Sequence, residues 1–183
     1  LLVRPGPCVR TCSGMCLRLI RAVDVITQQP EWNGRHVAVL GVSQGGLQAL
    51  AAAGLDERVT FFSAGVAAGC DHAAAFAESP RVAGWPKLLD GLEGPKDVDG
   101  AAGTLEAAKE ASRYFDCVNF ATRIKCPGVM TVGFIDGACP PSSVYAAYNA
   151  LTVPKRMIAD PLAGHANTPE MGRETMDAVR RHF

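Results

Sequence analysis

The fold of this chain is decided by one stretch of sequence, VAVLGVSQGG at residues 37–46. Its first four residues are apolar and rich in valine, which is typical of a buried strand. A serine between glycines follows, and residues 47–53 then have the composition of a helix that Gly54 closes. A strand, a sharp turn and a helix in this order predict a nucleophile elbow, in which the turn holds the Ser43 hydroxyl away from the backbone.

The glycines and the residue after the serine have predicted roles in this turn. A tight strand-to-helix turn strains the backbone of Ser43 and crowds the residues two positions before and after it. We therefore expect that Gly41 and Gly45 must lack a Cβ, and that Gly46 lets the helix pack closely on the strand. The backbone N–H of Gln44 is the expected oxyanion donor. The pattern alone is weak evidence, and an ordinary glycine-rich turn is the alternative.

Length and composition restrict the class of protein. A chain of 183 residues is long enough for one domain with a substantial core. It is 48% hydrophobic, 20% charged and without net charge, so it has no electrostatic reason to bind nucleic acid or an anionic membrane. No apolar run approaches the length of a membrane span. Residue 1 is leucine and no signal peptide follows it, so we expect a missing or processed start. The compartment therefore stays open, with the cytoplasm slightly favoured.

The chain has seven cysteines, an odd number scattered along the sequence, which favours reduced thiols over disulfides. Cys8, Cys12 and Cys16 recur every four residues, so on a helix they would share one face and suggest a metal site. The prolines and glycine at 5–7, together with Gly14, argue against a regular helix there. Because no histidine or acidic residue lies nearby to complete a ligand set, we predict no metal and no cofactor.

Apolar strands and helical segments alternate along most of the chain. The alternation predicts an α/β fold, with a mostly parallel sheet and helices on both faces. The stretch at about 70–103 is rich in proline and glycine and breaks the alternation, so we expect an inserted loop or lid within a single domain, 1–183. The expected strands are 37–40, 59–66, 127–135 and 156–159, and the further helices are 17–28, 104–114, 142–151 and 169–182.

A reactive serine needs a base within hydrogen-bond reach and an acid that orients the base, both at the carboxyl ends of strands. Asp136 directly follows the strand expected at 127–135, and His165 lies among small residues before the last helix. An Asx turn is the alternative role for Asp136, and a structural histidine the alternative for His165. Asp160 is a rival acid, but its neighbour Pro161 favours a turn. The order serine, aspartate, histidine is that of an α/β-hydrolase.

Four segments make the chain resemble the acetyl xylan esterase and cephalosporin C deacetylase family, family 7 of the carbohydrate esterases, which has the α/β-hydrolase fold. They are GVSQGG at 41–46, GFID at 133–136, CPPSSVYAAYN at 139–149 and GH at 164–165. The resemblance extends from about residue 15 to 169. It implies a nucleophile at Ser43, an acid at Asp136, a base at His165, and hydrolysis of acetyl esters of sugars or small alcohols without a metal, often in a homo-oligomer.

The chain departs from this family in two places. Ala166 stands where family members usually have glutamate, which removes a supporting contact. Members are also longer and carry several strands and an Arg-Gly-Gln motif before the helix that matches 17–28, so we expect the N-terminal strands to be missing and residues 1–16 to be unrelated. Without them, a second oxyanion donor is lost, at a cost of about 10²- to 10³-fold in rate. The strand at 37–40 also gains an apolar unpaired edge.

These observations lead to one main hypothesis and two alternatives. The main hypothesis is a serine carboxylic ester hydrolase that removes acetyl groups from sugar or small-alcohol esters. The first alternative is a truncated, weak or inactive remnant that associates through the edge at 37–40. The second is a peptidase or another acyl hydrolase on the same fold.

Overall fold

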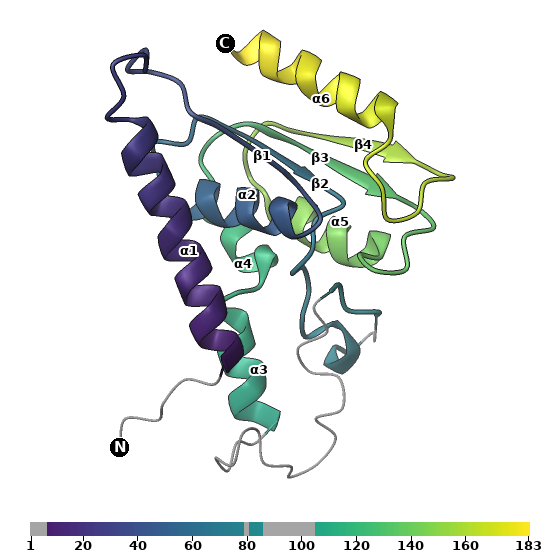
Figure 1. The fold of residues 1–183 in the computed structure, drawn as a ribbon. Coiled ribbons are helices and arrows are strands. Elements are labelled where there is room, and N and C mark those ends of the chain that lie inside the picture. The colour runs from purple at the N-terminus through teal and green to yellow at the C-terminus, as the bar shows by residue number, and fades with distance from the viewer. Residues whose placement is uncertain (1–6, 79–80, 86–104) are drawn as a thin grey trace, which may run out of the picture.

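The computed structural model describes residues 7–78, 81–85 and 105–183, with side chains described from residue 13 onward except those at 75 and 105–108. Four strands form one sheet in the order β1-β2-β3-β4, and every pair of neighbours is parallel (Figure 1). The predicted parallel sheet is therefore confirmed. The strands are β1 (Ala38–Val42), β2 (Phe61–Gly65), β3 (Gly128–Gly133) and β4 (Lys155–Asp160).

Helices cover both faces of the sheet, as predicted (Figure 1). One face carries α1 (Pro7–Ile26), α2 (Gln44–Leu55), α4 (Cys117–Ala121) and α5 (Pro141–Ala150), and the other carries α6 (Pro169–His182). Successive strand residues point to opposite faces and so enter two different cores. Phe62 and Met130 lie in the larger core, which includes residues of α2, α4 and α5, whereas Phe61 and Val129 pack under α6.

The N-terminal helix corrects one expectation. The sequence argument against a regular helix around the first cysteines is wrong, because α1 begins at Pro7 and continues through Gly14 to Ile26. Proline is tolerated in the first turn of a helix, because the N–H groups of that turn have no partner within the helix and the one that proline lacks is not needed. Cys8, Cys12 and Cys16 therefore do lie on one helix.

β1 forms the edge of the described sheet, since it pairs with β2 alone among the four strands. The side chains of Leu40 and Val42 on this strand are both 46% exposed. An apolar edge strand at this position agrees with the expected unpaired edge.

Most of the insertion expected at about 70–103 lies outside the described residues. Its described part contains a short 3-10 helix, η1 (Ala74–Phe76), and an ion pair between Arg81 and Asp71 at 2.8 Å. The helix expected at 104–114 is present as α3 (Leu105–Arg113). No helix in the described ranges is both long enough and apolar enough to cross a membrane.

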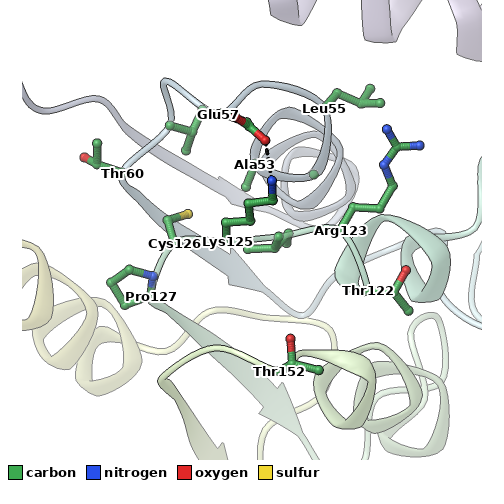
Figure 2. Close-up of a pocket in the computed structure, with 13 residues that line it drawn as sticks. Ala53, Leu55, Glu57, Thr60, Thr122, Arg123, Lys125, Cys126, Pro127 and Thr152 are labelled. Atoms are coloured by element: carbon green, nitrogen blue, oxygen red, sulfur yellow. Dashed lines mark hydrogen bonds and ion pairs between the residues drawn. The ribbon is translucent and has the colours of Figure 1, made fainter.

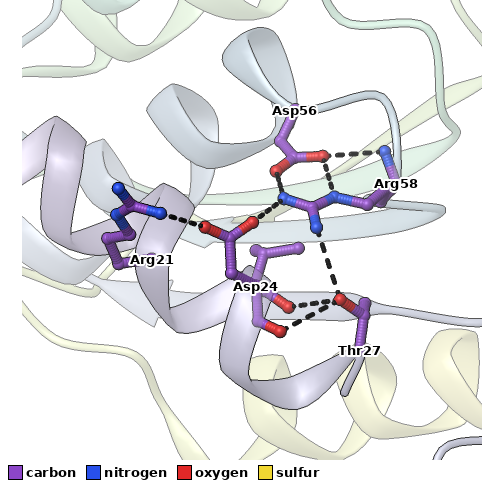
Figure 3. Close-up of polar contacts among 6 residues, drawn as sticks. Arg21, Asp24, Thr27, Asp56 and Arg58 are labelled. Atoms are coloured by element: carbon purple, nitrogen blue, oxygen red, sulfur yellow. Dashed lines mark hydrogen bonds and ion pairs between the residues drawn. The ribbon is translucent and has the colours of Figure 1, made fainter.

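A cluster of charged side chains joins α1 to the segment that follows α2 (Figure 3). The Arg58 guanidinium donates to Asp56 at 2.6 Å and to Asp24 of α1 at 2.7 Å. The hydrogen bonds from Arg58 hold the pKa of both carboxyl groups below the usual range. Asp56 is the more buried of the two, so this arginine offsets the cost of removing a carboxylate from water.

We expect Arg58→Met to lower the urea midpoint of unfolding at pH 7, because it leaves the buried Asp56 carboxylate without its cation. Since the folded pKa of Asp56 is lowered, this stabilisation is present above the unfolded pKa of about 4 and is lost as the pH falls through the folded value. The difference in urea midpoint between Arg58→Met and the unchanged chain should therefore become smaller below about pH 4.

The matched control is Arg21→Met, which removes one exposed ion pair to Asp24 and should barely move the midpoint. Equal midpoints for the two variants at pH 7 would contradict the role given to Arg58.

Candidate active site

The turn between β1 and α2 has the strained geometry of an elbow. Ser43 precedes α2 with φ 58° and ψ −118°, a conformation that L-residues rarely adopt and that costs about 1–3 kcal/mol. Its N–H donates to the Gly65 carbonyl at 2.8 Å, and its carbonyl accepts from the Ala68 N–H at 3.0 Å. The end of β2 and the segment after it therefore hold the serine in place.

The glycines of the elbow differ in their roles. A Cβ on Gly41 would lie 2.1 Å from the carbonyl oxygen of Gly45, so this glycine is required, as predicted. A Cβ on Gly46 would lie 3.0 Å from the Cα of Ala67, which agrees with close packing of α2 on the segment after β2. The prediction for Gly45 is wrong, since a Cβ there would meet nothing within 4 Å. Only the backbone of Gly45 takes part in the crowding.

Three residues far apart in the sequence meet at the carboxyl ends of the strands. The Ser43 Oγ lies 2.8 Å from the His165 Nε2, and the His165 Nδ1 lies 2.8 Å from an Asp136 carboxylate oxygen. The Asp136 side chain is fully buried, whereas the imidazole is 34% exposed. This is the arrangement in which a buried acid orients a base against a hydroxyl.

Backbone groups fix the acid in its position. The second oxygen of Asp136 accepts the N–H groups of Ala138 and Cys139, each at 2.8 Å. The aspartate therefore forms the Asx turn that was the structural alternative, while its other oxygen faces His165. The two roles coexist because a carboxylate has two oxygens.

Asp160, the rival acid, organises a turn instead. Its side chain accepts the N–H groups of Leu162 and Ala163 at 2.9 and 3.1 Å, and its carbonyl accepts the Phe134 N–H at 3.0 Å. The Ile135 N–H donates to the Ala163 carbonyl at 3.1 Å. These bonds join the loop that carries His165 to the segment that carries Asp136.

Sequence reasoning missed a second anchor of the histidine loop. The Thr131 hydroxyl in β3 donates to the side-chain oxygen of Asn167 at 2.9 Å and accepts the Val66 N–H at 3.2 Å. Val66 itself has φ 38°, which is unusual for a β-branched residue and is stabilised by these bonds. A threonine inside an otherwise apolar, buried strand was the available signal, but nothing in the sequence connects it to Asn167.

Gln44, the expected oxyanion donor, is the first residue of α2. The first N–H groups of a helix have no partner within the helix, and the helix dipole places partial positive charge there. Its role stays a prediction.

We expect Gly133→Ala to displace the histidine loop. A Cβ at the end of β3 would lie 2.4 Å from the carbonyl oxygen of Ala163 and 2.5 Å from that of Gly164, and backbone must move to make room. The expected cost is about 1–3 kcal/mol in the free energy of unfolding, measured with urea. Gly137→Ala is the control, because a Cβ there meets nothing within 4 Å. Equal free energies of unfolding for the two variants would show that position 133 tolerates a Cβ.

The described residues also form a cavity of about 730 Å³ away from this site (Figure 2). It lies near the amino ends of β2, β3 and β4, and its lining includes Thr60, Lys125 and Thr152. Lys125 is paired with Glu57 at 2.5 Å. The elbow, Asp136 and His165 lie at the opposite ends of the strands, so this cavity does not hold the substrate of the candidate site.

Within the described ranges, one group of side chains has the composition and spacing of metal ligands. It consists of Asp136, Cys139 and His165. Two of these three residues belong to the candidate site itself.

Comparison with known proteins decides the family. The family model for acetyl xylan esterase (AXE1) matches residues 14–180. The chain belongs to the acetyl xylan esterase family. The acetyl esterase Axe7A of Xylanibacter ruminicola is 38% identical over 153 residues, which are 82% of this chain and 32% of Axe7A.

Solved structures of the esterase family have the same fold. The acetyl xylan esterase from Paenibacillus sp. R4 is 30% identical with a TM-score of 0.76, over 92% of this chain and 52% of that one. Acetyl xylan esterase 1 from Thermoanaerobacterium sp. JW/SL YS485 is 27% identical with a TM-score of 0.75, over the same shares. The chain thus spans about half the length of these structures and a third of Axe7A. An acylaminoacyl peptidase of Pyrococcus horikoshii, 14% identical with a TM-score of 0.65, shows the fold alone.

These matches confirm the resemblance that the sequence motifs indicated, and with it the α/β-hydrolase fold. The family is one of esterases, and the curated relative is an acetyl esterase.

Proposed function

We propose that this chain carries the catalytic residues of a serine esterase that removes acetyl groups from esters of sugars or small alcohols. One observation supports the proposal above the others. A continuous chain of hydrogen bonds runs from buried Asp136 through His165 to the Ser43 hydroxyl, in a member of the acetyl xylan esterase family.

The geometry suits acyl transfer through Ser43. The hydroxyl oxygen attacks the acetyl carbonyl carbon while its proton moves to the His165 Nε2, 2.8 Å away. Asp136 keeps the other ring proton on Nδ1 and stabilises the imidazolium that forms. The C–O bond to the alcohol then breaks, the alcohol leaves with the proton from Nε2, and an acetyl group stays on the serine oxygen.

The same groups release the acetyl group. Water attacks the acetyl-serine carbonyl as Nε2 accepts one of its protons, and the bond to the Ser43 oxygen breaks as that proton returns to it. Acetate and the free serine result. The imidazole is 34% exposed, so solvent water reaches it.

We assign the Gln44 N–H as one donor to the oxyanion of both tetrahedral intermediates. A second donor normally comes from a loop after the third strand of the complete fold. Loss of one of the two donors lowers the rate of such a site about 10²- to 10³-fold.

A panel of ester and amide substrates tests the proposal, with p-nitrophenol, p-nitroaniline or acetate measured as the product. We expect hydrolysis of p-nitrophenyl acetate and acetylated xylo-oligosaccharides, slower turnover of longer acyl esters, and none of amino-acyl p-nitroanilides. Preferential cleavage of the anilides would instead support a peptidase.

The edge of the sheet supports a second candidate, association with another chain. Among the described residues, β1 pairs with β2 on one side only, and its free edge with half-exposed Leu40 and Val42 forms a surface that another strand could extend. Sedimentation equilibrium measures the molar mass in solution, and so tests both this association and the expected formation of a homo-oligomer. A monomer at tens of micromolar would contradict both, whereas an oligomer that Leu40→Lys dissociates would support association through β1.

A further inference from the structure

A cysteine lies directly beside the candidate catalytic residues. The Asx turn of Asp136 folds the chain back, so that the N–H of Cys139 reaches the carboxylate and its side chain approaches the same site. The Cys139 Sγ, a carboxylate oxygen of Asp136 and a ring nitrogen of His165 all lie within 4.8 Å of one another. The thiol is buried, at 1% exposure, and none of the steps above uses it.

A thiolate, an imidazole and a carboxylate are the side-chain ligands that bind Zn²⁺ in proteins. Such ions take three protein ligands at about 2.0–2.3 Å and leave a fourth position to water, so the ligand atoms stand roughly 3.3–3.8 Å apart. The three groups need to move little to reach this spacing. The complex of a divalent cation with one thiolate and one carboxylate has no net charge. Burying this complex therefore costs much less than burying the cation alone.

We propose that Asp136, Cys139 and His165 form an inhibitory site for a thiophilic divalent cation such as Zn²⁺ or Cd²⁺. The cation bonds to the Cys139 Sγ, whose proton leaves to solvent, and to the His165 Nδ1. The proton of Nδ1 moves to Nε2, so that Nε2 no longer accepts the Ser43 proton. The inhibition rests on the proposed function, whereas the binding of the cation does not.

Binding is tested by Cd²⁺ titration, followed by the ultraviolet charge-transfer absorption of the Cd²⁺–thiolate bond. The parent for this test carries Cys8→Ser, Cys12→Ser and Cys16→Ser, because three cysteines on α1 would compete with Cys139 for Cd²⁺. We expect one equivalent to bind, and both Cys139→Ser and Cys139→Ala to lose the absorption and at least about 10²-fold in affinity. Cys126→Ser, which removes another buried thiol, should bind as the parent does.

Two outcomes overturn the site: no saturable absorption in the parent, or an unchanged titration in a folded Cys139 variant. Circular dichroism shows which variants are folded, and His165→Ala should weaken binding without removing the thiolate absorption.

Inhibition is tested separately, by the rate at which a fluorophosphonate labels Ser43 with and without Cd²⁺. The cation should slow labelling in the parent, a chelator should restore it, and Cys139→Ala should label at the same rate in both conditions. Equal slowing in Cys139→Ala would overturn the inhibitory role. If nothing labels Ser43 even without Cd²⁺, the proposed function fails, while the titration still decides whether the cation binds.

Discussion

Ser43→Ala should lower the hydrolysis of p-nitrophenyl acetate at least about 10⁴-fold. The hydroxyl is the group that bonds to the acetyl carbon, and it lies 2.8 Å from the His165 Nε2 that accepts its proton. The initial rate of p-nitrophenolate release at saturating substrate measures the effect.

Ser13→Ala is the control for this variant, since Ser13 is an exposed serine on α1. It should hydrolyse the ester as fast as the unchanged chain. Equal rates for Ser43→Ala and Ser13→Ala would mean that surface nucleophiles cleave this activated ester.

Asp136→Asn should lower kcat by about 10⁴-fold with little change in fold. An amide oxygen can still accept the N–H groups of Ala138 and Cys139, so the turn is retained. The amide NH₂, however, donates toward Nδ1, which forces the ring proton onto Nε2 and leaves no base against Ser43. Steady-state rates together with circular dichroism separate this effect from unfolding.

Asp160→Asn is the matched control, because Asp160 was the rival acid in the sequence. Its side chain accepts two backbone N–H groups in the turn before His165, and an asparagine oxygen accepts them equally well. Most of the activity should remain. A larger loss in Asp160→Asn than in Asp136→Asn would reverse the assignment of the acid.

The sequence predicts the sheet well because three of its four strands, β1, β2 and β3, are largely apolar runs followed by turn residues. Gly128–Gly133 and Pro169–His182 match their expected positions within two residues. The meeting of Ser43, Asp136 and His165 could also be predicted, because each follows a parallel strand and all carboxyl ends share one edge. The short helix α4 was missed, since five residues are too few to show a helical period.

Other features depend on contacts that a sequence does not display. Gly41 and Gly45 lie at equal distances from Ser43 in the sequence, which suggests that both must lack a Cβ. In the structure only Gly41 has no space for one, because its Cβ would meet the backbone of Gly45. The bond between Thr131 and Asn167 joins positions 36 residues apart. His182 at the end of α6 packs against Phe61 of β2, with 5.1 Å between the ring centroids.

The most direct test of the account is to treat the folded chain with a fluorophosphonate and locate the adduct by mass spectrometry. We predict a single adduct on Ser43, formed far more slowly in His165→Ala because the hydroxyl has lost its base. An unlabelled folded chain, or a Ser43→Ala variant that acquires the same label, would contradict the claim that Asp136 and His165 make this serine reactive.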